Sequence, residues 1–143
     1  MALASELNIG EHVRFFPTAP FDQIASIMTQ ADIGVVPKRA DTFGDVAYST
    51  KIMEFMALGV PVVVADTRVD RFYFNDSVVR FFESGSADAL AAAILDTLEN
   101  REETRGRVTR ALAYARSNCW ETRKHDYLAL VDSLCVNGSV CRG

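Results

Sequence analysis

Two short apolar segments, residues 33–37 and 62–66, constrain the fold of this chain more than any other feature. Each is built almost entirely from Val, Ile, Ala and Gly before a closing Pro or Asp. Neither shows the alternation of apolar and polar residues that marks a strand with one face in water, and such runs are typical of parallel strands covered on both faces. The sequence therefore predicts a parallel sheet with helices on both sides.

The neighbouring segments extend this pattern. Residues 13–17 and 78–82 are also short and rich in Val and Phe, which predicts two more strands. Between the strands, apolar residues recur at helical spacing, as in residues 21–31 and 51–58. The alternation predicts an α/β fold, an open, doubly wound, Rossmann-like and mainly parallel sheet of about four strands. Ligands of such sheets bind at the carboxyl ends of the strands.

The last third of the chain is predicted to be almost wholly helical. Residues 101–116 are strongly charged, which is typical of a solvated helix lying across the domain. An apolar stripe follows, and we expect its helix to dock on the core; the stripe consists of Trp120, Tyr127, Val131 and Leu134. We expect one domain over residues 1–136 and a flexible tail over residues 137–143.

Size and charge exclude several classes of protein. The chain has 143 residues, of which 49% are hydrophobic, and this suits one globular domain rather than a disordered segment. Its net charge of -4, with no basic block, argues against a nucleic-acid partner. No apolar run approaches the roughly 18 residues of a membrane span, and the first residues do not show a charged leader followed by an apolar stretch. We expect a soluble protein of the cytoplasm.

Cysteine and histidine usage gives little sign of metal or disulfide chemistry. The odd number of cysteines, Cys119, Cys135 and Cys141, suits a reducing compartment, with a Cys135–Cys141 bridge as the alternative. The two histidines, His12 and His125, are isolated in the sequence, so we expect no metal and no cofactor.

Residues 37–66 hold most of the functional information. A polar loop follows Pro37, Ser49 or Thr50 is suited to cap a helix that begins at Lys51, and Gly59 is suited to end it. An uncapped helix start after a strand binds anions, and a carboxylate nearby accepts sugar hydroxyls. Glu54, placed by this pattern in the first turn, is such a carboxylate. Alternatively it only favours the positive helix end or pairs with Lys51.

This stretch also resembles a known family. Residues 49–63 read Ser-Thr-Lys-Ile-Met-Glu-Phe-Met-Ala-Leu-Gly-Val-Pro-Val-Val, close to the signature S-x-K-x-x-E-x-M-A-x-G-x-P-V-V. That signature belongs to glycosyltransferases of the two-domain GT-B architecture, in the retaining group called glycosyl transferase group 1. Similarity continues on both sides, in residues 13–33, in residues 88–94 and in Trp120 with Tyr127, and so covers nearly all of the chain.

The resemblance implies a donor-binding, C-terminal half that holds a nucleotide sugar, with Glu54 on the ribose. The family's second acid, which contacts the donor sugar, usually opens an E-x-F-G segment eight positions before the ribose glutamate. Here Asp41-Thr42-Phe43-Gly44 has the local look, but Asp41 lies thirteen positions before Glu54 and Asp45 lies nine before it. We favour Asp41, with Gly44 in the same turn, and keep Asp45 and two merely solvated loop acids as alternatives.

The pyrophosphate of the donor would lie at the helix start. Backbone N–H groups around Tyr48, Ser49 and Thr50, together with their hydroxyls, are suited to hold it, and Lys51 to neutralise it. An exposed helix lysine without this role is an equal alternative.

The resemblance also implies partners and limits. It implies retaining, metal-independent transfer, in polysaccharide or glycoconjugate synthesis. The family's N-terminal acceptor-binding domain and two central strands are missing, so we expect a fragment or remnant that is inactive alone and dimerises through an exposed sheet edge. The alternatives are a nucleotide-sugar epimerase of the same architecture and a noncatalytic interaction module with a vestigial site.

Overall fold

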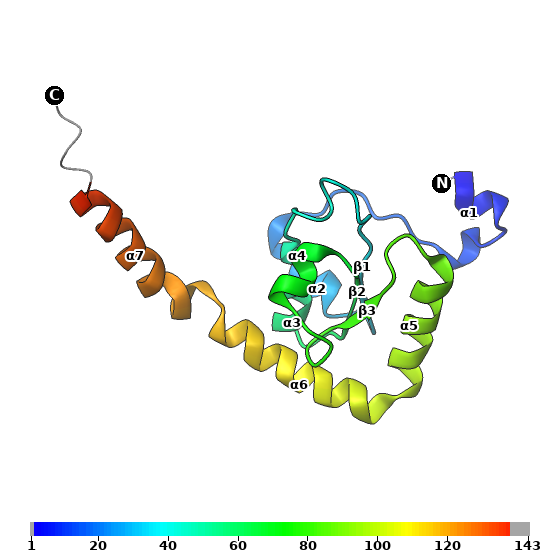
Figure 1. Cartoon of the computed structure of the whole chain (residues 1–143). Coiled ribbons are helices and arrows are strands. Elements are labelled where there is room, and N and C mark those ends of the chain that lie inside the picture. The colour runs from blue at the N-terminus through cyan, green and yellow to red at the C-terminus, as the bar shows by residue number, and fades with distance from the viewer. Residues whose placement is uncertain (1, 138–143) are drawn as a thin grey trace.

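A computed structural model describes residues 2–137 and contains a three-stranded parallel sheet between helices (Figure 1). The strands are β1 (Gly34–Val36), β2 (Val62–Ala65) and β3 (Arg80–Phe82), in the order β1-β2-β3. In this register Val36 lies opposite Val64, and Val64 lies opposite Phe81. The predicted α/β class and the parallel pairing are confirmed.

Helices cover both faces of the sheet. Alternate residues of β2 point to opposite faces, and all four are buried. Val62 and Val64 belong to a core under α3 (Thr50–Ala57) and α6 (Arg101–Ser117), whereas Val63 and Ala65 pack under α5 (Ala87–Glu99). This double burial explains why the β2 sequence is apolar throughout, as predicted.

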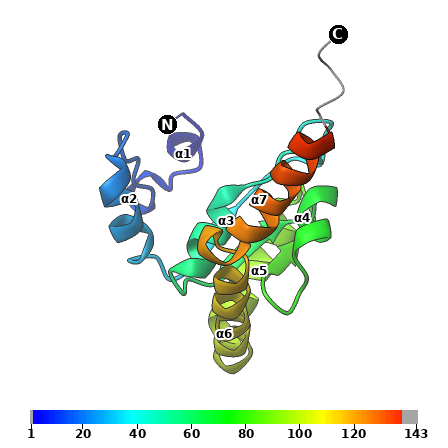
Figure 2. The ribbon, with the colours of Figure 1, turned by 90° about the vertical axis from the view of Figure 1, so that its left-hand side faces the viewer.

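The remaining helices lie before and after the sheet or between its strands. The short α1 (Ala2–Glu6), a 3-10 turn (Gly10–His12) and α2 (Phe21–Met28) precede the sheet, and Figure 2 shows them beside it rather than within it. The α2 prediction is confirmed with an earlier end, and α3 ends at Ala57, two residues before the predicted Gly59, whose φ of 72° is left-handed. The sequence analysis missed α4 (Arg68–Tyr73).

The predicted strand at residues 13–17 is wrong. This segment is irregular, and Phe15 and Phe16 are 59% and 70% exposed. A strand is stable only when neighbours pair with it, and here β1 pairs with β2 instead. The sheet therefore has three strands, with β1 and β3 at its edges. Dimerisation through such an edge stays a prediction.

The predicted docking of the C-terminal stripe is also wrong. The α7 helix (Trp120–Asn137) forms as predicted but extends away from the sheet (Figure 1). Trp120, Tyr127 and Leu134 are 59%, 55% and 64% exposed, and the first two rings pack against each other at 5.7 Å. The two faces of the sheet are covered by α3 and α6 and by α5 instead. The first residue of the predicted tail, residue 137, is the last residue of α7, whereas residues 138–143, with Cys141, lie outside the described residues.

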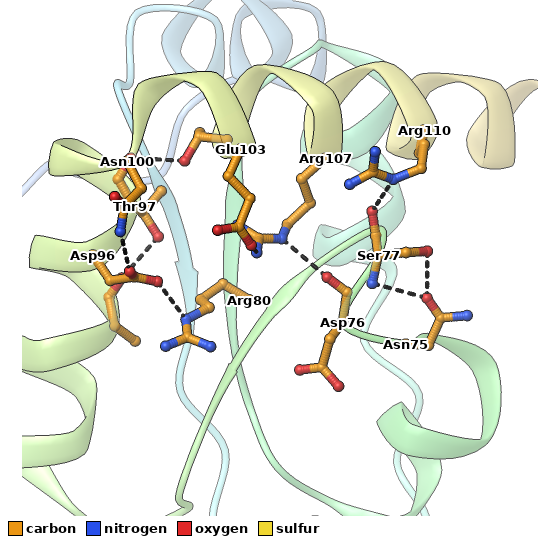
Figure 3. Close-up of polar contacts among 12 residues, drawn as sticks. Asn75, Asp76, Ser77, Arg80, Asp96, Thr97, Asn100, Glu103, Arg107 and Arg110 are labelled. Atoms are coloured by element: carbon orange, nitrogen blue, oxygen red, sulfur yellow. Dashed lines mark hydrogen bonds and ion pairs between the residues drawn. The ribbon is translucent and has the colours of Figure 1, made fainter.

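Arginines fasten α6 to the segment before β3 (Figure 3). Arg107 is 6% exposed, and its Nε donates to the Asp76 carbonyl at 3.0 Å, while Arg110 Nε donates to the Ser77 carbonyl at 2.8 Å. The prediction of a charged helix across the domain is confirmed, but Arg107 is buried rather than solvated. On the face of the sheet that α5 covers, an ion pair of 2.9 Å between Arg80 Nε and Asp96 Oδ2 joins β3 to α5.

None of the helices in residues 2–137 combines the length and the apolar character that crossing a membrane requires.

Candidate functional site

Three strand-to-helix connections leave the carboxyl edge of the sheet, where open α/β folds bind ligands. Residues 37–49 join β1 to α3, residues 66–67 join β2 to α4, and residues 83–86 join β3 to α5. The predicted site residues before α3 all lie in the first connection, which is by far the longest of the three.

A tight turn shapes the middle of this long connection. The Gly44 N–H donates to Asp41 Oδ1 at 2.8 Å, and a Cβ added at Gly44 would lie 1.7 Å from the Arg39 carbonyl oxygen. Only glycine fits so close to that backbone. The hydrogen bond from Gly44, helped by the Arg39 guanidinium, holds the pKa of Asp41 below its usual value. The predicted catalytic acid therefore orders the turn and remains an exposed carboxylate.

The start and the end of the connection meet at a buried ion pair. Lys38 Nζ lies 2.6 Å from Asp70 Oδ2 and donates to the Ala47 carbonyl at 2.8 Å. Asp70 is fully buried in α4 and also accepts a hydrogen bond of 2.6 Å from the Thr67 hydroxyl. The sequence analysis missed this pair. The spacing Thr67-x-x-Asp70 is a helix-start signal and would have placed both residues at the beginning of α4.

The connection from β3 to α5 and the start of α4 also fasten the long connection. The Ser84 hydroxyl donates to the Lys38 carbonyl at 2.7 Å and accepts from the Ala40 N–H at 2.8 Å. Asp45 Oδ1 accepts from the Arg68 N–H at 3.1 Å. The alternative acid Asp45 thus lies at the start of α4, where it accepts from the backbone.

The long connection ends in a hollow at the start of α3. This hollow has a volume of about 480 Å³, and its lining includes Lys38, Phe43, Tyr48, Ser49, Thr50 and Lys51. Ser49, one of the two residues predicted as the cap of this helix, is its N-cap residue, but its side chain makes no cap hydrogen bond. The first turn of α3 therefore keeps N–H groups that no side chain caps, at the end of the helix that carries positive potential.

Tyr48 joins the hollow to an aromatic cluster. Its ring packs edge-on against Tyr73 at 4.9 Å and stacks on Phe74 at 6.0 Å. Loss of solvent around the ring, with smaller effects from Tyr114, Tyr73 and Asp70, raises the pKa of Tyr48 to about 12. The phenol is therefore neutral and able to donate a hydrogen bond.

Glu54 lies apart from this hollow. Because α3 begins at Thr50, Glu54 is in the second turn, and the prediction of a first-turn position is wrong. It is exposed and lines a groove of about 260 Å³ between α2 and α3 with Ile24, Ala25, Met28, Ala57 and Leu58. However, the i, i+4 spacing puts Glu54 and Thr50 on one face of the helix, so a single extended ligand is able to contact both.

The structure thus gathers some predicted site residues and separates others. Tyr48, Ser49, Thr50 and Lys51 share one hollow, Asp41 and Gly44 form the turn beside it, and Glu54 lies one helical turn away. Within residues 2–137, no three His, Cys, Asp or Glu side chains gather as a group of metal ligands.

Known proteins share both the sequence pattern and the fold. The family model of the glycosyl transferases group 1 matches residues 1–113. The D-inositol 3-phosphate glycosyltransferase of Nocardia farcinica is 34% identical over 123 residues, which cover 82% of this chain and 25% of that protein. The enzyme of the same name from Thermomonospora curvata is 34% identical over 120 residues, covering 83% of this chain and 27% of that protein.

A solved structure extends the comparison to the fold. Sucrose-phosphate synthase from Thermosynechococcus elongatus superposes with a TM-score of 0.84 at 22% identity, over 96% of this chain and 34% of that one. The chain thus spans about a quarter of the length of the curated relatives described above.

Proposed function

The chain belongs to the glycosyl transferases group 1 family, and we propose that it is the donor-binding part of an enzyme that transfers a sugar from a nucleotide sugar to an acceptor. One observation carries the proposal: the uncapped start of α3 opens into a hollow at the carboxyl end of β1. The lining side chains, three hydroxyls and the exposed ammonium of Lys51, suit a phosphorylated ligand.

The diphosphate of the donor would lie against the first turn of α3. Free N–H groups and the positive end of the helix dipole favour an anion there. The hydroxyls of Ser49 and Thr50 add donors, and the exposed Lys51 adds a compensating charge. In this proposal transfer is metal-independent, because fixed N–H groups and Lys51 stabilise the departing nucleoside diphosphate.

The ribose would lie next to Glu54. Side chains at i and i+4 on a helix are about 5–6 Å apart at Cβ, so a ligand bound at Thr50 reaches Glu54 along one face of α3. A carboxylate there accepts hydrogen bonds from two vicinal hydroxyls. The groove between α2 and α3 would then receive the nucleoside.

Asp41 remains our proposed acid for the donor sugar. Its lowered pKa keeps it ionised at neutral pH, which suits an oxocarbenium-like sugar in a retaining transfer. We also propose that the 143 residues transfer no sugar by themselves, because alignment of an acceptor and exclusion of water need a second wall over the hollow. Synthesis of a polysaccharide or glycoconjugate in the cytoplasm is the role we favour.

Calorimetry with UDP, GDP and ADP tests the proposal. We expect one of them to bind the chain with a Kd in the millimolar range, about -4 kcal/mol. Glu54→Gln keeps the shape but removes the charged acceptor, and in the full-length protein it should cost about 1.5 to 3 kcal/mol of nucleotide affinity. Glu99, an exposed carboxylate at the end of α5, supplies the matched control: Glu99→Gln should leave nucleotide affinity unchanged.

Two outcomes would contradict the proposal. Absence of binding by all three nucleotides would favour the noncatalytic module, and equal affinity of wild type and Glu54→Gln would remove Glu54 from the site. An epimerase would bind nucleotide as well, but would convert a nucleotide sugar without an acceptor.

A further inference from the structure

We propose that Lys38 is a positioning residue for the candidate site. Its ammonium fixes the end of the 37–49 connection and at the same time neutralises the buried Asp70 carboxylate. The consequence for nucleotide affinity rests on the proposed function, whereas the consequence for the order of the connection does not.

The contacts of Lys38 tie together both ends of the connection. Its Nζ lies between Asp70 Oδ2 at 2.6 Å and the Ala47 carbonyl at 2.8 Å, while its own carbonyl accepts from the Ser84 hydroxyl at 2.7 Å. Ala47 immediately precedes Tyr48 and Ser49. The orientation of its peptide group therefore determines how the chain enters α3 and how those two residues line the hollow.

The charge balance around Asp70 makes Lys38 hard to replace. Asp70 is 0% exposed, and the Lys38 side chain is 14% exposed. Asp70 Oδ2 accepts from both Lys38 and Thr67, whereas Oδ1 is buried and has no hydrogen-bond partner among the described residues. Without Lys38 the carboxylate would be left as an uncompensated buried charge.

Stability alone does not account for such a pair. Replacing a buried ion pair by uncharged groups of similar size is often neutral or stabilising, whereas removing one partner is strongly destabilising. The specific gain here is geometric, because the ammonium that neutralises Asp70 is the same group that holds the Ala47 carbonyl. A change that removes both charges should preserve the fold and release the connection.

Three variants separate positioning from folding. Lys38→Met alone should lower Tm by about 10 °C or more, because a buried carboxylate loses its partner. The double variant Lys38→Met with Asp70→Asn should melt within about 5 °C of wild type. Asp70→Asn alone keeps Lys38 on the Ala47 carbonyl and an amide oxygen for Thr67, and it serves as the second variant if the double one does not fold.

Amide hydrogen exchange and calorimetry supply the two readouts. In the double variant, exchange in residues 40–50 should quicken about tenfold or more, and affinity for the nucleoside diphosphate that binds wild type should fall about tenfold. Asp70→Asn should stay within about threefold of wild type in both. Arg80→Met with Asp96→Asn removes an ion pair from the other side of the sheet and is the matched control; neither readout should move.

The outcomes keep the two proposals apart. Unchanged exchange in the double variant would overturn the role of Lys38, and so would an Asp70→Asn variant that loses as much as the double variant. If wild type binds no nucleotide while the double variant still shows faster exchange in residues 40–50, the positioning role stands and the proposed function fails.

Discussion

The connections from β1 to α3 and from β3 to α5 leave the same edge of the same sheet, yet they are built differently. Residues 83–86 are short, turn through Gly85 at a φ of 85°, and end at Ser86, whose hydroxyl accepts from the Ala89 N–H at 3.1 Å. Residues 37–49 are long, carry a buried ion pair, and end at Ser49, whose side chain caps nothing.

The difference separates a structural helix start from one available for a ligand. At α5 the side chain satisfies a backbone donor that would otherwise need water or a ligand. At α3 the donors stay open, and the chain uses buried side chains of other elements to hold the approach to them rigid. Such an arrangement stabilises the position of a site rather than the helix itself.

Gly44→Ala should have a larger effect on stability than either N-cap substitution below. Its new Cβ would lie 1.7 Å from the Arg39 carbonyl oxygen, so the turn has to open. We expect a loss of about 1–3 kcal/mol in the free energy of unfolding, as for other overpacked sites, and faster exchange in residues 40–50. Denaturant titration followed by amide exchange measures both.

Gly10→Ala is the control, since a Cβ there meets nothing within 4 Å. It should change stability by less than about 0.5 kcal/mol. If Gly44→Ala were as mild as Gly10→Ala, the long connection would not be held as tightly as its contacts imply.

Replacing each of the two N-cap serines should have a smaller effect on stability than Gly44→Ala. One replacement should affect stability and the other nucleotide affinity. Ser86→Ala should cost about 1 kcal/mol of stability, because α5 loses its cap, and should leave nucleotide affinity unchanged. Ser49→Ala should change stability by less than about 0.5 kcal/mol but weaken nucleotide binding roughly threefold to tenfold. Thermal melts and calorimetry on both variants would show equal losses if the two helix starts were alike.

Local pattern was sufficient to predict much of the fold. The uninterrupted apolar run of β2 indicates burial on two faces, and Gly59 indicates the left-handed residue that follows α3. Local pattern did not predict which strands pair or which helices dock on the core. Residues 13–17 have strand-like composition but pair with no described strand, and the α7 stripe has the spacing of a docking helix but stays exposed.

In the candidate site, too, the contacts between residues close in sequence were predictable, and those between distant residues were not. Residues 48–51 are consecutive, so their gathering at one helix start followed from the sequence. Lys38 and Asp70 come from different elements far apart in the chain, and only the folded sheet brings them together. The position of Glu54 in the second turn depended on a helix boundary, which sequence patterns locate poorly.

Titration of the ¹⁵N-labelled chain with UDP, GDP and ADP, followed by amide chemical shifts, tests the central claim most directly. We predict that one nucleotide shifts the amides of residues 48–54 and leaves residues 86–89 at the start of α5 in place, because of these two helix starts only that of α3 lacks a side-chain cap. Shifts centred on residues 86–89, or none at millimolar nucleotide, would contradict a donor site at the start of α3.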